Sequence, residues 1–320
     1  MGDTGNIVAF AGGVGGGKLA TGLARALAAD RLTIVVNTAD DFEHLGLHVS
    51  PDLDSVMYAM AGMENTETGW GIAGETWSFM EALARLGGET WFRLGDRDLA
   101  THVVRTRRLR AGDTLSEITA SLYAALGIAH RVVPMSDDAV RTAVVTDTGI
   151  LDFQDYFVRQ QAEPHVRGFE FRGAGAARPA PAVEAALADP SLAAIVVCPS
   201  NPFVSVAPIL AVPRIGAAVR SRRVPLVAVS PIVGGKAVKG PAMRMMLDLG
   251  IESSALGIAR HYGDLIDGLV IDRVDAALAG PIEALGIRVH VMDTIMRTAE
   301  DKARLADATA EFARTLAVRG

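Results

Sequence analysis

A glycine-rich segment between an apolar run and a helical pattern constrains the fold of this chain most. Residues 7–11 have the continuous apolar character of a buried strand, and residues 12–18 contain five glycines and end in Lys18. Apolar side chains then recur at helical spacing up to residue 29, and a run of β-branched residues follows at 32–37. This order predicts a strand–helix–strand unit with a parallel sheet and a right-handed crossover.

The rest of the chain indicates that the same sheet is resumed after an interruption. Residues 51–129 have a mostly helical pattern, with Pro51 suited to a first helical turn, and the extended runs 141–146 and 151–158 predict a hairpin. A Gly/Pro/Ala-rich connection covers residues 172–181, and apolar runs return at 193–197, 224–229, 269–271 and 289–292. We therefore predict an α/β fold: a doubly wound, mainly parallel, Rossmann-like sheet with a central, mostly helical insertion and a small β-hairpin.

In this interpretation residues 1–50 and 176–320 form the two parts of an α/β nucleotide-binding core, and residues 51–175 form the insertion. The net charge of −6 argues against nucleic-acid binding, and we interpret Arg105, Arg107, Arg108 and Arg110 as a solvated helix end or loop. The single cysteine, Cys198, excludes an internal disulfide. No apolar stretch approaches the ~18 residues of a membrane span. We expect a cytoplasmic protein without a membrane partner.

The glycine-rich loop has the setting of a phosphate site, because backbone N–H groups and a helix N-terminus attract anions. Its candidate phosphate-binding residues are Gly12, Gly13, Gly15 and Lys18. The spacing matches the start of a P-loop, but Leu19 replaces the expected Ser or Thr, and the dinucleotide pattern fits only weakly. A tight turn that needs glycine only for its conformation stays open as the alternative.

Four aspartates follow the second predicted strand within a short stretch: Asp40, Asp41, Asp52 and Asp54. The carboxyl edge of a parallel sheet is where ligands bind, and Mg²⁺ prefers hard oxygen ligands shared with substrate phosphates. We take Asp40, Asp41 and Asp54 as candidate Mg²⁺ ligands. For Asp52 and Ser50, capping of the following helix is an equally good interpretation.

Three further loops carry candidate binding groups. Around Gly95, the basic Arg93 and Arg97 alternate with aspartates, an arrangement that suits phosphate binding or a surface turn with local salt bridges. In the rigid loop after residue 197, Ser200 and Asn201 are candidates for hydrogen bonding to a ligand. Residues 230–241 add glycines and two lysines, Lys236 and Lys239.

Six motifs in this order resemble the 2-phospho-lactate transferase family of coenzyme F420 biosynthesis, over nearly the whole chain. They are Ala11-Gly-Gly-Val-Gly-Gly-Gly-Lys18, Asn37-Thr-Ala-Asp-Asp41, Ser50-Pro-Asp-Leu-Asp54, Gly95-Asp-Arg-Asp-Leu-Ala-Thr-His102, Pro199-Ser-Asn-Pro202 and Ser230-Pro-Ile-Val-Gly234. The resemblance implies a transferase in which the ribityl hydroxyl of the deazaflavin FO attacks a guanylyl-activated phospho-acid and GMP leaves. It implies that the insertion forms the deazaflavin side of the site.

The resemblance also implies roles for single residues and partners. Asp54 and Arg93 would contact FO, and Asp54 would also be a candidate Mg²⁺ ligand or base, with Asp41 and Arg97 as further catalytic candidates. Gly12, Gly13, Gly15, Ser200 and Asn201 would hold the guanylyl part. The acid could be of phospholactate, phosphoenolpyruvate or phosphoglycerate origin, and we expect a homodimer.

Two other interpretations stay open at this point. One is a P-loop-like kinase or nucleotidyltransferase that turns over ATP or GTP without a deazaflavin, which Leu19 argues against. The other is a non-catalytic nucleotide-binding regulatory protein, for which the carboxylate at position 54 and the charged segment 95–98 would be unnecessary.

Overall fold

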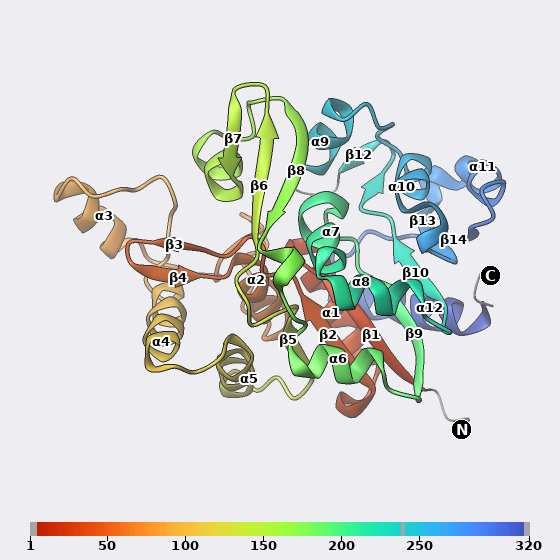
Figure 1. Ribbon diagram of the computed structural model, residues 1–320, viewed down its shortest axis with the longest axis horizontal. Coiled ribbons are helices and arrows are strands. Elements are labelled where there is room, and N and C mark those ends of the chain that lie inside the picture. Colours follow the sequence, from red (N-terminus) through yellow and green to blue (C-terminus); the bar gives the residue numbers. More distant parts are fainter. Residues whose placement is uncertain (1–4, 238–240, 317–320) are drawn as a thin grey trace.

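Seven parallel strands form the centre of the computed structural model, which describes residues 5–237 and 241–316 (Figure 1). Their order in the sheet is β14-β13-β10-β9-β1-β2-β5, and each neighbouring pair is parallel. The strands are β1 (Asn6–Ala11), β2 (Leu32–Val36), β5 (Arg131–Pro134), β9 (Leu192–Val197), β10 (Leu226–Val229), β13 (Gly268–Asp272) and β14 (Arg288–Met292). The predicted parallel α/β sheet is confirmed.

Helices cover both faces of this sheet, which confirms the doubly wound arrangement. Alternate side chains of β1 enter different cores: Val8 and Phe10 pack on one face, and Ile7 and Ala9 on the other. One face is covered by α1 (Gly13–Ala26), α2 (Pro51–Met60), α5 (Leu115–Ala125) and α12 (Ala299–Thr315). The other is covered by α6 (Pro181–Leu187), α7 (Ala207–Ala211), α8 (Pro213–Arg220), α10 (Ala255–Tyr262) and α11 (Ala279–Glu283).

The central part of the chain contains helices and a small antiparallel sheet, as predicted. Besides α2 and α5 it includes α3 (Ser78–Arg85), which lies far from the main sheet in Figure 1, and α4 (Asp98–Ala111). The hairpin is formed by β6 (Arg141–Thr146) and β7 (Gly149–Asp152). Its second strand is shorter than expected because the chain turns into a π-helix at Asp155–Arg159.

Two strands in this region were not predicted. β8 (Val166–Arg172) pairs with β6 and completes a three-stranded sheet, although much of its surface is exposed, which weakens its apolar pattern. β5 pairs with β2, so residues between 51 and 175 also contribute to the main sheet. Two short hairpins, β3 (Phe42–His44) with β4 (Leu47–Val49) and β11 (Ile232–Val233) with β12 (Lys236–Ala237), lie in loops. The helix α9 (Ala242–Asp248) follows the second of these, and Lys239 lies outside the described residues.

None of the helices in the described ranges is by itself long and apolar enough to cross a membrane. One bent pair, Pro202–Ala211 with Pro213–Arg220, meets the length and composition of a span only when its two halves are taken together across a 94° bend.

Candidate active site

The predicted binding loops meet where the strand order reverses. From β1 the chain builds the sheet outward through β2 to β5, and it later returns to the other side of β1 with β9. The glycine-rich loop follows β1 and the Ser200 loop follows β9, so both leave the same edge of adjacent parallel strands. In open α/β sheets this switch point is the usual place for a ligand.

The glycine-rich segment and the Ser200 loop contact each other directly. The Ser200 hydroxyl accepts a hydrogen bond from the Gly12 amide (3.0 Å) and donates one to the Gly12 carbonyl oxygen (2.9 Å). A Cβ atom at Gly15 would collide with the carbonyl oxygen of Pro199. Gly13 has φ +61°, a conformation that favours glycine, and it already begins helix α1. The segment predicted as a loop is therefore largely the first turn of α1, and close packing explains part of its glycine content.

The side-chain carboxylate of Asp52, a residue of helix α2, lies at the N-terminus of helix α1. Its Oδ1 accepts a hydrogen bond from the Gly13 amide (2.7 Å), and its Oδ2 accepts one from the Asn37 side chain (3.0 Å). Ser50, at the N-cap position of α2, instead donates to Asp41 (2.8 Å) and makes no side-chain cap. The interpretation that Asp52 or Ser50 caps the following helix is wrong: Asp52 caps a different helix.

Asp40 and Asp41 lie beside Asp52 and keep free acceptor capacity. Both are buried, and Oδ1 of each has no hydrogen-bond partner among the described residues. The other oxygen of Asp41 accepts from Ser50 and lies 3.1 Å from His48 Nε2. Burial, together with the carboxylates of Asp52 and Asp41, raises the pKa of Asp40 well above its usual range. Within the described ranges no arginine or lysine forms an ion pair with these three aspartates.

The chemistry of Asp40 and Asp41 suits a magnesium ion, although the ligand atoms of Asp40, Asp41 and Asp52 do not form a group of three that lie within 4.8 Å of one another. Buried carboxylate oxygens without a partner are costly, and a hard divalent cation satisfies both their charge and their lone pairs. Asp40 and Asp41 stay predicted ligands, and Asp52 is a neighbour whose charge adds to theirs.

The same crowding predicts a pH-dependent stability. Burial raises the pKa of Asp52 to about 6 from 3.8, so between these values the folded protein holds a proton that the unfolded chain has lost. The free energy of unfolding of the metal-free protein should therefore fall by about 1 to 3 kcal/mol as the pH rises through 6. Urea unfolding in EDTA at pH 5 and pH 7 measures this difference. Asp52→Asn should flatten the profile, and an unchanged slope in that variant would contradict the assignment.

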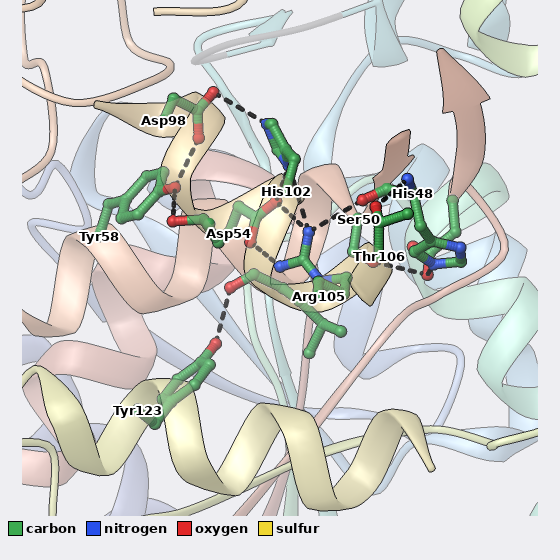
Figure 2. Close-up of polar contacts among 12 residues, drawn as sticks. His48, Ser50, Asp54, Tyr58, Asp98, His102, Arg105, Thr106 and Tyr123 are labelled. Carbon is green, nitrogen blue, oxygen red and sulfur yellow. Dashed lines mark hydrogen bonds and ion pairs between the residues drawn. The ribbon is translucent and has the colours of Figure 1, made fainter. Parts of the chain in front are cut away.

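Asp54 belongs to a second buried cluster, in which Arg105 is the cation (Figure 2). Both carboxylate oxygens of Asp54 accept hydrogen bonds from the Arg105 guanidinium, with Nη1 3.1 Å from Oδ2. Burial alone would lower the pKa of Arg105, but the charge of Asp54 outweighs it and raises that pKa. A metal ion at Asp54 would have to share oxygens that already contact a cation.

The cluster extends from Arg105 through His102 to Asp98 and Tyr58 (Figure 2). Arg105 Nη1 lies 3.3 Å from His102 Nδ1, and because a guanidinium only donates, we assign Nδ1 as the acceptor and the ring proton to Nε2. Nε2 lies 3.3 Å from Asp98 Oδ2, and the Tyr58 hydroxyl donates to Asp98 Oδ1 at 2.5 Å. Ligand atoms of Asp54, Asp98 and His102 lie within 4.8 Å of one another, a spacing that would also admit a metal.

The arginines of the charged segment lie outside both clusters. The Arg97 guanidinium donates to the Ala73 carbonyl oxygen at 2.9 Å, and its backbone N–H donates to Glu75. Arg93 is exposed, with its guanidinium 4.0 Å from the centre of the Trp77 ring. In this conformation neither side chain contacts an aspartate of the two clusters.

Lys18 and Asn201 also have partners away from the aspartates. Lys18 Nζ donates to the Met296 carbonyl oxygen at 3.2 Å, next to helix α12. The Asn201 side-chain oxygen accepts from the Phe203 amide at 2.9 Å and so caps the turn that follows its own loop. The geometry thus brings Gly12, Gly13, Gly15 and Ser200 together with the aspartates, while Lys18 and Asn201 point elsewhere.

Arg105 and His102 are the main site residues that sequence reasoning missed. Arg105 is only 2% exposed, so its interpretation as part of a solvated basic run is wrong. Its partner Asp54 lies 51 residues earlier, and spacing in the sequence does not predict a contact between residues so far apart. Helical periodicity did carry a signal, because Asp98, His102 and Arg105 fall on one face of α4.

Comparison with known proteins agrees with this architecture. A structure of a UPF0052 family member, BH3568 from Bacillus halodurans, superposes with a TM-score of 0.61 at 14% sequence identity and covers 95% of this chain and 98% of that one, a likeness of fold. A phosphoenolpyruvate transferase of Streptomyces griseus is 43% identical over 96% of this chain and 98% of its own length. A 2-phospho-L-lactate transferase of Methanosarcina mazei is 38% identical over 94% of this chain and 98% of its own.

The family description that matches is "2-phospho-L-lactate transferase CofD", and it spans residues 7–308, which include both clusters and both loops of the switch point. The chain therefore belongs to the CofD family of 2-phospho-L-lactate transferases, transferases of coenzyme F420 biosynthesis.

Proposed function

We propose that the protein transfers a phospho-acid moiety from a guanylyl-diphospho-acid to the ribityl hydroxyl of the deazaflavin FO and releases GMP. The new bond joins the ribityl oxygen to the phosphorus nearest the acid, and the bond between that phosphorus and the GMP oxygen breaks. The ribityl proton leaves to solvent or to a nearby carboxylate.

One observation carries this proposal. Three buried aspartates that form no ion pair with an arginine or lysine among the described residues lie directly beside the N-terminus of α1, at the switch point of the sheet. The carboxylates attract a cation and the helix N-terminus attracts an anion, and a magnesium-bound diphosphate contains both. Membership of the CofD family supports the same reaction class.

One set of residues would bind the guanylyl donor, and another would bind FO. The backbone around Gly12, Gly13 and Gly15, with Ser200, would bind the guanylyl phosphates in exchange for the bonds that Gly12 and Gly13 now make to Ser200 and Asp52. Asp40 and Asp41 would hold Mg²⁺ nearby. Bound Mg²⁺ would supply charge neutralisation at the diphosphate. On the other side, the carboxylate of Asp54, fixed by Arg105, would orient the ribityl hydroxyl.

For the acid, we propose the phosphoenolpyruvyl group as the first candidate. The relatives from Streptomyces griseus and Streptomyces avermitilis, at 43% and 44% identity, are both named phosphoenolpyruvate transferases, whereas the Methanosarcina relatives at 38% are named for phospholactate. The homodimer and the cytoplasmic location expected from the sequence belong to the same proposal.

The test is a transfer assay with FO, MgCl₂ and each of the three guanylyl-activated acids, with product detected by mass spectrometry. We expect an FO adduct and equimolar GMP, fastest with the phosphoenolpyruvyl donor, and loss of both products in EDTA. Consumption of GTP or ATP without FO would instead favour a kinase. Absence of an FO adduct with all three donors would overturn the proposal.

A further inference from the structure

Helix α4 places Asp98, His102 and Arg105 along one face, and His102 is the middle member of this row (Figure 2). The residue is only 1% exposed, and its ring lies between the Asp98 carboxylate and the Arg105 guanidinium. A side chain that is enclosed in this way does not reach a ligand. Any influence of His102 on a reaction therefore passes through its two neighbours.

These two neighbours fix the protonation state of the ring. Burial alone would raise the pKa of Asp98, but its contact with His102 and the hydrogen bond from Tyr58 outweigh burial and lower that pKa. Asp98 is therefore an ionised acceptor, and the His102 Nε2 atom that faces it at 3.3 Å carries the proton. Because a guanidinium only donates, Nδ1 presents its lone pair to Arg105. The ring is held in one neutral form.

The lone pair of Nδ1 is one of three acceptors that determine where the Arg105 guanidinium lies. Its Nη1 atom is 3.1 Å from Asp54 Oδ2, 3.3 Å from His102 Nδ1 and 3.4 Å from the His48 carbonyl oxygen. Nη2 donates to the other carboxylate oxygen of Asp54, so the guanidinium and the carboxylate form a two-bond fork. Without Nδ1 the guanidinium can turn toward His48, and the carboxylate has to turn with it.

We propose that His102 is a positioning residue for the transfer: its Nδ1 atom fixes the Arg105 guanidinium and thereby the plane of the Asp54 carboxylate. The inference rests on the proposed function, in which Asp54 orients the ribityl hydroxyl for attack. A displacement of about 1 Å at a reacting group can lower a rate by about 10²-fold. Such a contact affects the rate of the chemical step more than the binding of the acceptor.

Three substitutions separate the two ring nitrogens. In His102→Asn the side-chain oxygen can take the place of Nδ1 and accept from Arg105. In His102→Gln the amide nitrogen can instead take the place of Nε2 and donate to Asp98, and His102→Leu removes both contacts. The matched control is His165→Leu, because His165 also lies beside an aspartate, with Nδ1 2.9 Å from Asp248, but belongs to neither cluster and is exposed.

For each protein we would measure kcat and KM for FO, the MgCl₂ concentration for half-maximal rate, and the midpoint of thermal unfolding. The ring-nitrogen chemical shifts of His102, assigned by NMR from the signals lost in His102→Asn, report which nitrogen carries the proton. In the wild-type protein these shifts should show a protonated Nε2 and an unprotonated Nδ1.

We expect His102→Leu and His102→Gln to lower kcat at least about 10-fold, with KM for FO changed less than about 3-fold. His102→Asn should keep kcat within about 3-fold of the wild-type value, and His165→Leu should leave kcat unchanged. If His102→Leu does not fold, the comparison of His102→Asn with His102→Gln still decides.

Equal losses of kcat in His102→Asn and His102→Gln, or a normal kcat in His102→Gln, would overturn the inference and leave the transferase proposal intact. A proton on Nδ1 would overturn it as well. A higher MgCl₂ requirement in the variants, or a shift of the His102 signals on addition of MgCl₂ alone, would make His102 a metal ligand instead. Absence of an FO adduct with the wild-type protein would overturn both proposals.

Discussion

Replacing Arg105 with methionine should lower the free energy of unfolding by about 3 to 5 kcal/mol. Methionine fills much of the space of the arginine stem but leaves the buried carboxylate of Asp54 without its cation. It also removes the donor that holds His102 Nδ1 and the His48 carbonyl oxygen. Urea unfolding followed by far-UV circular dichroism measures the change.

Two further variants separate the ion pair from general damage to helix α4. Arg107→Met changes an exposed arginine of the same helix and should cost less than about 0.5 kcal/mol. Combining Arg105→Met with Asp54→Asn should destabilise less than the sum of the single changes, since the uncompensated charge disappears. A loss below about 1 kcal/mol in Arg105→Met would show that Asp54 does not depend on this cation.

Asp41→Asn should lower kcat/KM for the transfer at least about 10²-fold. The substitution keeps the size of the side chain and an acceptor for the Ser50 hydroxyl, but it removes one negative charge from the proposed cation site. Mg²⁺ should then bind more weakly, so the MgCl₂ concentration for half-maximal rate should rise. Steady-state rates across a MgCl₂ series, with Mg²⁺ binding followed by calorimetry, give both quantities.

Asp30→Asn is the matched control, because Asp30 is an exposed aspartate near strand β2 and should leave both quantities unchanged. Near-normal activity and Mg²⁺ affinity in Asp41→Asn would remove Asp41 from the metal site. Asp41 makes a cleaner test than Asp54, since a change at Asp54 also leaves the buried Arg105 without its counter-ion.

The elements predicted from sequence are those whose signal is local. Strand β1 and helix α1 follow from continuous apolar character and helical spacing, and the strands of the second half follow from apolar runs between polar loops. β5 was missed because it is short and directly follows a long helical pattern, and β8 was missed because its exposed side chains interrupt the apolar pattern. Both are recognised as strands only through their hydrogen-bonded pairing, β5 with β2 and β8 with β6.

The candidate site shows the same division between local and distant information. The placement of Gly12 and Asp41 at strand ends follows from the order of strands, which one sequence reveals. The bond between Asp52 and the start of α1, and the pairing of Asp54 with Arg105, join segments that are distant along the chain. A sequence alone does not show which distant charges lie close together in the fold. The basic run at residues 105–110 therefore looked solvent-exposed, although Arg105 is buried against Asp54.

The central position of β1 has a consequence for how the chain acquires its structure during synthesis. β1 lies between β2 and β9, and Gly12 contacts Ser200 from 188 residues further along the chain. Helix α1 packs against α12, the last described helix. The first βαβ unit therefore leaves the ribosome with one sheet edge and one helix face uncovered, and both wait for segments translated much later. Such long-range closure slows folding and lengthens the time during which a nascent chain depends on chaperones.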